Sequence, residues 1–377
     1  MEDTPILNRQ RRLRDALGSA DLDALVLNPG PTLTYLTGMH FHLMERPIVG
    51  IFPAEGPAAL ILPELETPKT EGAPFELLPF PYGEDPSRWG ETFRRAAQSL
   101  ALDGKRLGVE SVRLRYLELT YLQEAAPHAR FISAPEVIAS LRMVKDAAEI
   151  LAMRKAVAIA QDALRATLPL IRLGMSEKEL ASELVLQLLR HGSEPQLPFF
   201  PIVAGGPNSA NPHAVPTERP IRAGELLLID WGATVEGCYS DLTRTFALGE
   251  LSDPELGRVA EVVAQANAAG RAAARPGLPA GEVDAAARRV IAEAGYGQYF
   301  THRTGHGLGR DGHEPPYIYA ENTRPLAPGM TFTVEPGIYL PGRGGVRIED
   351  DMLVTVNGAE SLSDLPRELG IGDWVNG

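Results

Sequence analysis

The sequence has almost no cysteine and no hydrophobic run of membrane-spanning length. Cys238 is the only cysteine among 377 residues, so the chain cannot form an internal disulfide. This suits a reducing compartment, and we expect a cytoplasmic protein in which Cys238 is a small buried side chain rather than a catalytic thiol. No apolar stretch approaches the roughly 20 residues of a membrane helix, and the run from Leu226 to Ile229 is far too short. The arginine-containing N-terminal segment also lacks the pattern of a signal peptide.

The sequence has no excess of positive charge either. Its 36 Lys and Arg residues are outnumbered by 49 Asp and Glu residues, and the formal net charge is -13. Because a nucleic-acid partner requires a basic surface that displaces counterions from phosphates, we expect no nucleic-acid binding. With 44% hydrophobic and 23% charged residues the composition is that of a globular protein, and the length favours two domains.

Helix and strand patterns alternate up to about residue 135, which predicts an α/β domain over residues 1–135. This part contains no phosphate-binding loop and no internal repeat. Residues 82–89 are expected to form a surface loop. The predicted strands are 24–27, 47–52, 58–62 and 106–110, and the predicted helices are 9–17, 90–102 and 113–124.

Longer helices predominate in residues 136–377. Ser176 and Glu179 have the spacing of a capping box, which predicts the start of a helix that runs through Leu189. The order of patterns is helix pair, strands, helix pair and strands, so we expect an α+β domain made of two related halves. The predicted helices are 143–170, 177–189, 254–274 and 281–294, and the first is expected to bury Val144, Ala147, Ile150, Leu151, Ala156 and Ile159.

Two acidic residues are predicted to face each other at the end of a hairpin. Asp230 ends an apolar strand, a glycine-containing turn follows, and Asp241 comes 11 residues later on the returning strand. Like charges this close repel unless a cation lies between them. The pattern therefore indicates half of a metal site.

The C-terminal part repeats this arrangement. Glu335 ends an apolar strand and Glu349 returns 14 residues later, while His306 lies between glycines that allow close backbone approach. Four carboxylates balance two divalent cations, and an oxygen-rich site with one nitrogen suits Mn²⁺, Co²⁺ or Zn²⁺ without distinguishing among them. We expect manganese, with cobalt or zinc as alternatives. Two such ions could activate a shared water for hydrolysis.

Asp230, Asp241, His306, Glu335 and Glu349, in this order and with these flanking residues, resemble the ligands of the pita-bread metallopeptidases. That family includes methionine aminopeptidase, aminopeptidase P, prolidase and the non-peptidase creatinase. The resemblance implies a pita-bread catalytic domain with pseudo-twofold halves over residues 136–377, a smaller creatinase-type N-terminal domain over residues 1–135, and a homodimer.

The resemblance also implies a role for each ligand. Asp230 is expected on one metal and Asp241 and Glu349 between the two, while His306 and Glu335 complete the other metal. The family assigns the general base to Glu335. Because a metal-bound carboxylate is an awkward base, we expect proton handling to be shared with the bridging water.

Three further histidines match the proline-specific branch of the family. The resemblance implies that His213 contacts the scissile carbonyl or the tetrahedral intermediate, and that His302 and His313 orient substrate and pass protons. The alternatives are an exposed loop imidazole for His213 and structural support for the other two. Methionine aminopeptidases do not usually carry this full set.

Three other residues near the motifs need separate interpretation. Arg347 lies two residues before Glu349, on the same strand face, where it could either steady the carboxylates or reach the substrate. Trp231 points away from Asp230 and is expected in the core. Arg310 departs from the apolar residue common in relatives, which affects local packing or specificity.

The resemblance predicts a metal-dependent exopeptidase that cleaves the bond between an N-terminal residue and proline. Xaa-Pro dipeptides are slightly favoured over longer peptides with proline second. A dipeptidase also requires a group that captures the C-terminal carboxylate of the substrate. Such a group could come from the N-terminal domain or from the other subunit, and the sequence does not place it. The alternatives are creatinase-like C–N hydrolysis without metal, which the five retained ligands disfavour, and a catalytically inactive binding module of the same fold.

Overall fold

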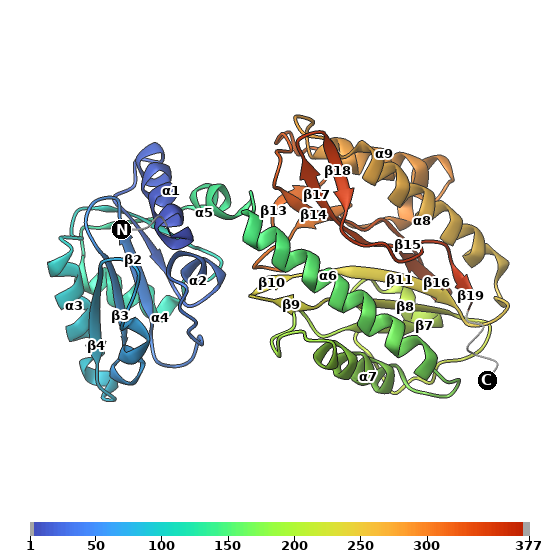
Figure 1. The fold of residues 1–377 in the computed structure, drawn as a ribbon, viewed down its shortest axis with the longest axis horizontal. Coiled ribbons are helices and arrows are strands. Elements are labelled where there is room, and N and C mark those ends of the chain that lie inside the picture. Colours follow the sequence, from blue (N-terminus) through green and yellow to red (C-terminus); the bar gives the residue numbers. More distant parts are fainter. Residues whose placement is uncertain (1–3, 372–377) are drawn as a thin grey trace. The chain divides into compact units, whose positions relative to one another are not determined.

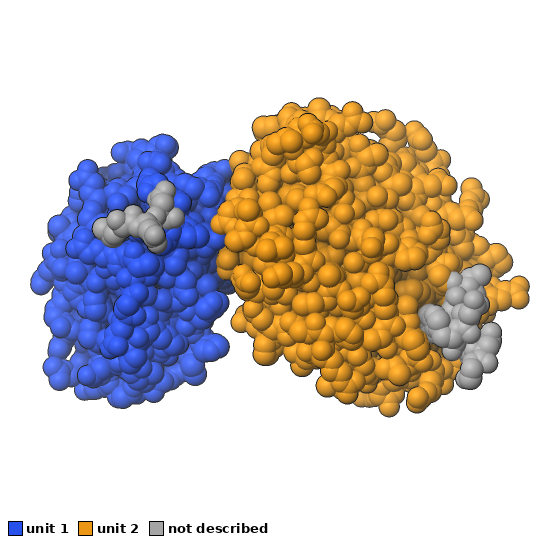
Figure 2. All heavy atoms as spheres, in the orientation of Figure 1, with its two compact units in different colours: residues 1–142 blue, residues 143–377 orange. Residues whose placement is uncertain are grey.

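The computed structural model describes residues 4–371, which form two compact units (Figure 2). One unit ends at Arg142 and the other begins at Met143, so helix α5 (Pro135–Arg142) belongs to the first unit. Among the described residues, no helix combines the length and the apolar character that a membrane span requires.

The first unit is a six-stranded mixed sheet with helices on both faces (Figure 1). The central strand is β1 (Ala24–Leu27). Its Leu25 and Leu27 pack into one core, and Ala24 and Val26 pack into the other, because neighbouring side chains of a strand point to opposite faces. Helices α1 (Pro5–Ser19), α2 (Pro31–Thr37) and α5 contribute to the first core, and α3 (Trp89–Ser99) and α4 (Tyr116–Ala125) contribute to the second. The strand order is β4 (Leu77–Tyr82), β3 (Ala58–Pro63), β2 (Val49–Pro53), β1 (Ala24–Leu27), β5 (Arg106–Val109) and β6 (Arg130–Ser133).

The prediction of a surface loop over residues 82–89 is wrong for its first and last residues. Tyr82 ends strand β4, Trp89 begins helix α3, and both side chains are buried with ring centroids 5.3 Å apart. Strand β4 was missed because it contains Pro79 and Pro81, which ordinarily argue against a strand. Proline is tolerated here because β4 is an edge strand of the sheet.

The second unit confirms the predicted order of helix pairs and strands, and its class is α+β (Figure 1). Helices α6 (Ala147–Thr167) and α7 (Glu177–Arg190) share a core with a four-stranded sheet, and α8 (Pro254–Ala273) and α9 (Gly281–Glu293) share a core with the hairpin that precedes Glu349. The four-stranded sheet has the order β19 (Gly370–Ile371), β11 (Leu242–Ala247), β8 (Leu226–Trp231) and β7 (Ile202–Gly205). A five-stranded sheet has the order β13 (Glu314–Ile318), β12 (Gly305–Gly307), β14 (Thr331–Val334), β17 (Asp350–Thr355) and β18 (Gly358–Ser361). There are also two separate hairpins. One pairs β9 (Thr234–Val235) with β10 (Cys238–Tyr239), and the other pairs β15 (Gly337–Leu340) with β16 (Gly344–Arg347).

Helix α6 buries a different face from the one predicted. Val144 lies before the helix begins, Ala147 and Leu151 are exposed, and only Ala156 of the six predicted residues is fully buried. The buried face is rich in alanine, and its neighbour is the large indole of Trp231, whose Nε1 donates to the carbonyl of Ala160 at 2.8 Å. Small helix side chains leave room for this indole, which confirms that Trp231 is a core residue.

Candidate active site

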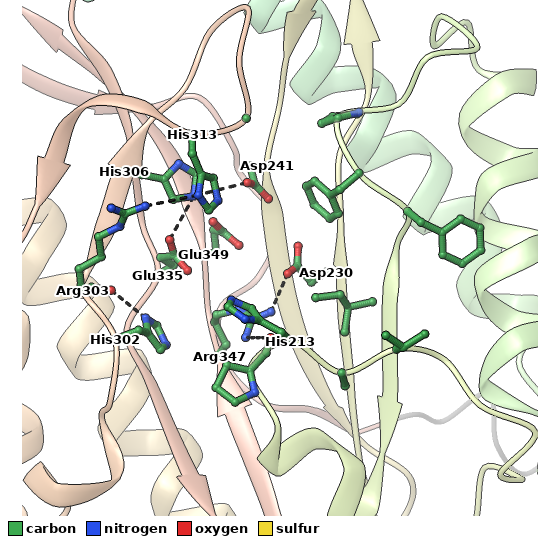
Figure 3. Close-up of a pocket in the computed structure, with 18 of the residues that line it drawn as sticks. His213, Asp230, Asp241, His302, Arg303, His306, His313, Glu335, Arg347 and Glu349 are labelled. Atoms are coloured by element: carbon green, nitrogen blue, oxygen red, sulfur yellow. Dashed lines mark hydrogen bonds and ion pairs between the residues drawn. The ribbon is translucent and has the colours of Figure 1, made fainter. Parts of the chain in front are cut away.

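All nine side chains predicted for the site line one cavity of about 960 Å³ in the second unit (Figure 3). The cavity also has an apolar wall that includes Phe199, Phe200 and Val215, and a further cation, Arg303. The predicted residues are Asp230, Asp241, His306, Glu335, Glu349, His213, His302, His313 and Arg347.

Two hairpin-like strand pairs bring the four carboxylates together. In the first, β8 and β11 are antiparallel, and the pair Trp231 and Leu242 places Asp230 and Asp241 at the end of the ladder. In the second, β14 and β17 pair up to Val334 and Asp350, directly before Glu335 and after Glu349. The two pairs meet where the backbone N–H of Glu349 donates to the carbonyl of Thr243 at 3.1 Å.

Glycines on both sides of His306 allow its strand to lie between two neighbours. A Cβ atom on Gly305 would lie 1.9 Å from the carbonyl oxygen of Thr333, and one on Gly307 would lie 2.4 Å from that of Pro315. The Nε2 atom of His306 therefore comes within 3.3 Å of Glu335 Oε1. Its Nδ1 atom lies 3.1 Å from the carbonyl oxygen of Gly307. Because a carbonyl only accepts, Nδ1 carries the proton and the Nε2 lone pair faces the carboxylates.

These residues fit a divalent cation. Ligand atoms of Asp241, His306 and Glu349 all lie within 4.8 Å of one another, and all three residues are buried. Asp230 Oδ1 is also buried and has no hydrogen-bond partner within residues 4–371. A buried carboxylate oxygen without a donor is costly, and a metal ion would satisfy it.

The electrostatics of the cluster lead to the same conclusion. Burial raises the pKa of Asp230, and burial together with the neighbouring carboxylates raises the pKa of Asp241 and Glu349 well above the ordinary range. Burial raises the pKa of Glu335 to about 7. Without a cation, such a cluster retains protons near neutral pH, whereas bound cations would displace them.

Arg347 is held entirely by protein groups around the cavity. Its guanidinium donates to Asp230 Oδ2 at 2.6 Å, to the Tyr339 hydroxyl at 3.0 Å, to Thr243 Oγ1 at 3.1 Å and to the Pro212 carbonyl at 3.2 Å. These contacts support the interpretation in which Arg347 steadies a carboxylate, rather than the one in which it reaches the substrate.

Tyr339, which the sequence motifs did not indicate, connects Arg347 to His302. Because arginine only donates, the Tyr339 oxygen accepts from Arg347 and its O–H is directed to His302 Nε2 at 2.8 Å. His302 Nδ1 in turn lies 2.7 Å from the carbonyl oxygen of Arg303, to which it donates. Burial lowers the pKa of His302 to about 4, so the ring is neutral at pH 7. The signal in the sequence is the glycine at 345, shortly before Arg347. Gly345 pairs with Tyr339 across the hairpin, and a Cβ atom there would lie 2.7 Å from the Tyr339 ring, so the glycine leaves room for the ring.

His213 and His313 are the exposed histidines of the cavity. His213 lies on the loop after the 3-10 helix η4 (Gly206–Ala210). The ring of His313 lies 3.8 Å from that of His306, and its Nδ1 is 3.3 Å from Arg303 Nη2. Since the guanidinium only donates, Nδ1 of His313 accepts and Nε2 carries the proton. Partial burial and the adjacent Arg303 lower the pKa of His313.

Two residues noted in the sequence do not line the cavity. Cys238 is buried, and burial raises the pKa of its thiol to about 11, so it is not a thiolate nucleophile at neutral pH. Arg310 donates to the buried Glu149 of α6 at 2.9 Å and to the carbonyl of Glu236 at 3.2 Å, which gives this arginine a packing role.

Known proteins resemble this chain over nearly its whole length. The family model described as metallopeptidase family M24 matches residues 151–356, and the model of the creatinase/prolidase N-terminal domain matches residues 9–144. An Xaa-Pro dipeptidase of Pyrococcus horikoshii is 34% identical over 369 residues, with 97% of this chain and 99% of that protein covered.

Solved structures agree with the sequence relatives. A recombinant prolidase from Thermococcus sibiricus has a TM-score of 0.91 at 34% identity, covering 97% of this chain and 99% of that one. An X-Pro aminopeptidase from Thermotoga maritima has a TM-score of 0.83 at 30% identity, covering 96% of this chain and 99% of that one.

The fold and the cluster of buried carboxylates define a metallopeptidase of the pita-bread type. The chain belongs to metallopeptidase family M24, and it carries the creatinase/prolidase N-terminal domain.

Proposed function

We propose that this protein is a metal-dependent exopeptidase that hydrolyses the bond between an N-terminal residue and proline. The observation that carries the proposal is the single cavity in which five candidate ligands, four of them buried, lie beside three histidines. Relatives named Xaa-Pro dipeptidase and prolidase support this substrate class. A relative named X-Pro aminopeptidase keeps peptides with proline second as the alternative substrate.

The proposed cofactor is a pair of divalent ions, manganese first, with cobalt and zinc as the alternatives to be tested. Asp230 is assigned to one ion, Asp241 and Glu349 to both, and His306 and Glu335 to the other. Bound there, the ions would lower the pKa of a water molecule and polarise the scissile carbonyl.

The side chains around the ligands carry the remaining steps. Proton handling is assigned to Glu335 together with the water that the ions would hold, because a metal-bound carboxylate is an awkward base on its own. His213, on an exposed loop of the cavity wall, is assigned to the developing oxyanion, and the Nε2–H of His313 to the substrate. His302 is a positioning residue, because both of its ring nitrogens are bound by protein groups.

The two alternative functions have less support. A creatinase-like hydrolase needs no metal, and a binding module needs no catalytic residues, yet this chain retains all five candidate ligands and the histidines in one cavity.

We further propose a homodimer and a cytoplasmic location, the latter consistent with a single buried cysteine. Sedimentation at several concentrations tests the dimer.

Metal removal and reconstitution test the function. Protein stripped by a chelator should lose hydrolysis of Xaa-Pro dipeptides and regain it with Mn²⁺, Co²⁺ or Zn²⁺, and Glu335→Ala should lose activity in every metal. Chelator-resistant activity, or a fully active Glu335→Ala variant, would overturn the proposal.

Comparison of Xaa-Pro with Xaa-Pro-Xaa separates the two peptidase types, because turnover of tripeptides alone identifies an aminopeptidase.

A further inference from the structure

We propose that Glu177 is a positioning residue that keeps His213 in the cavity wall by holding both ends of the loop that carries this histidine. The inference rests on the proposed function, since it explains how the side chain assigned to the developing oxyanion is kept in place. The sequence motifs gave Glu177 only a place in the first turn of a helix.

His213 lies in a segment with little regular structure of its own. Strand β7 ends at Gly205, the short helix η4 follows, and no helix or strand covers residues 211–217. His213 is exposed, so burial in a core does not hold it. Because fixing a loop costs conformational entropy, contacts from outside the loop are needed to keep His213 in one position.

The Glu177 carboxylate supplies such contacts at both ends of the segment. At the first end it accepts from the backbone N–H of Gly205 at 2.8 Å and from Asn208 Nδ2 at 3.0 Å. At the second end it accepts from the backbone N–H of Thr217 at 3.0 Å and from Thr217 Oγ1 at 2.6 Å. All of these donors are uncharged groups of residues 205–217, so the carboxylate binds the loop rather than a cation.

The burial of Glu177 makes both ends depend on it. Glu177 is 0% exposed, and a buried carboxylate is stable only where donors satisfy its oxygens. Oε1 accepts from Gly205 and Oε2 accepts from Thr217, so movement of either end leaves an oxygen short of donors. Hydrogen bonds to an ionised group are also roughly twice as strong as those between neutral groups.

Helix α7 gives this carboxylate a rigid base. Glu177 is its first residue, directly after the N-cap Ser176, where the positive end of the helix dipole favours a negative charge. The helix itself is fixed by Leu180, Leu184 and Leu188, which are buried in the core shared with the four-stranded sheet. The loop is therefore attached to an element that packing already holds in place.

Arg347 fixes the loop on the other side of His213. Its Nη1 donates to the carbonyl of Pro212, the residue directly before His213, at 3.2 Å. Glu177 holds Thr217, which comes four residues after His213. His213 thus lies between two anchors, and Figure 3 shows its ring among the side chains of the cavity. Loss of the Glu177 anchor should free residues 213–216, and none of the five candidate ligands belongs to this segment.

Hydrolysis of Leu-Pro by the manganese-loaded full chain tests the proposal. Glu177→Gln keeps the size of the side chain but directs N–H groups toward the N–H donors of the loop. Removing an oxyanion donor lowers kcat by roughly 100- to 1,000-fold, so displacing His213 should lower it by about 10- to 100-fold. KM and the affinity for Mn²⁺ should change less than about threefold, because the oxyanion forms only in the transition state. The exposed Glu218 provides a matched control, Glu218→Gln, which should leave all three quantities unchanged.

A double-mutant cycle with His213→Ala shows whether Glu177 acts through His213. In the His213→Ala background, Glu177→Gln should lower kcat less than about threefold, because the histidine is already absent. An equal loss in both backgrounds would overturn the proposal, since Glu177 would then act through some other group. Unchanged kcat in Glu177→Gln, or a parallel loss of bound manganese, would overturn it as well.

Thr217→Val provides a second variant if Glu177→Gln does not fold. It removes the hydroxyl that donates to Glu177 at 2.6 Å and leaves the carboxylate and its other donors in place. Its kcat should fall severalfold, with the same dependence on His213. A Thr217→Val variant with the kcat of the unmodified enzyme would contradict the proposal.

Hydrogen exchange separates this proposal from the proposed function, because it needs no substrate. The amides of residues 206–217 should exchange severalfold faster in Glu177→Gln than in the unmodified protein and in Glu218→Gln. Unchanged exchange in Glu177→Gln would overturn the proposal. An unmodified enzyme that hydrolyses no Xaa-Pro peptide, with this difference in exchange still present, would overturn the proposed function alone.

Discussion

At the scale of single residues, the direction of each hydrogen bond determines which atoms can face the substrate. Arg347 donates to Tyr339, Tyr339 to His302, and His302 to the backbone of Arg303. Each member therefore has one possible protonation state, and the neutral His302 is consistent with its pKa of about 4. The chain of bonds connects a candidate metal ligand, Asp230, with the backbone carbonyl of Arg303.

Removing the hydroxyl of Tyr339 should break this connection. Tyr339→Phe leaves a buried donor of Arg347 and the acceptor nitrogen of His302 unpaired, which costs about 1–3 kcal/mol. The free energy of unfolding, measured by urea denaturation, should fall by about that amount, and kcat should fall as well. The exposed Tyr319 supplies the control, and equal stability of Tyr339→Phe and Tyr319→Phe would contradict the prediction.

Replacing Arg347 by lysine separates its two possible roles. A lysine cannot reach Asp230, Tyr339, Thr243 and Pro212 together, so a ligand-steadying role predicts metal affinity about 10- to 100-fold lower. Titration calorimetry with Mn²⁺ measures this affinity. If Arg347→Lys instead keeps the metal affinity and raises only KM, the residue acts on the substrate.

At the scale of elements, the site depends on strands that approach more closely than side chains normally allow. Strand β12 carries His306 between β13 and β14, and both flanking glycines face backbone atoms of those neighbours. The position of the imidazole is therefore determined by the absence of two Cβ atoms. A larger residue at either glycine position would displace His306, even though the new side chain would touch no ligand atom.

Gly305→Ala should accordingly weaken metal binding. Its Cβ would lie 1.9 Å from the Thr333 carbonyl oxygen, and backbone cannot move away as a flexible side chain can. We expect manganese content after dialysis to fall severalfold and activity to fall with it. Gly358→Ala is the control, because its Cβ would enter open space. Normal metal content in Gly305→Ala would show that the strands tolerate the displacement.

Local sequence signals explain how much of these elements could be predicted. The capping box of α7 was readable because Ser176 and Glu179 contact each other's backbone N–H groups, at 3.2 and 2.7 Å, within one turn. The carboxylate hairpins were readable because Asp230 and Glu335 each come at the end of an apolar strand, and Asp241 and Glu349 each come directly before a returning strand. The buried face of α6 was not, because it depends on the distant Trp231, and neither were the connections made by Tyr339 and Arg303, which arise from tertiary contacts.

At the scale of the whole molecule, the buried acids make stability depend on protons and metal together. Burial raises the pKa of Glu335 from 4.5 to about 7 and raises those of Asp241 and Glu349 well above their ordinary values, so the metal-free folded state holds more protons than the unfolded chain. For such groups the stabilisation is complete below the unfolded pKa and is lost as pH rises through the folded pKa. His302 acts oppositely, but only between its folded pKa of about 4 and its unfolded pKa of 6.5.

Above pH 6.5, therefore, the Tm of metal-free protein should fall as pH rises. Between pH 6.5 and 8 we expect a decrease of roughly 5 °C, since each 1 kcal/mol corresponds to a few degrees in a chain of this size. Saturating Mn²⁺ should raise the Tm at pH 8 and flatten the profile, because bound cations replace the protons. Scanning calorimetry with and without chelator measures both curves. A flat metal-free profile would show that the carboxylates are already ionised.

The contact between Thr243 and Glu349 has a consequence for how the protein is made. A ribosome delivers Asp230 and Asp241 well before Glu335 and Glu349, so the early hairpin leaves the exit tunnel with its acids but without the opposing pair. Metal capture in the proposed arrangement must wait until the last strands have been synthesised. Loading of the ion would then mark the completion of the chain, and nascent chains that stop before residue 335 should retain no manganese.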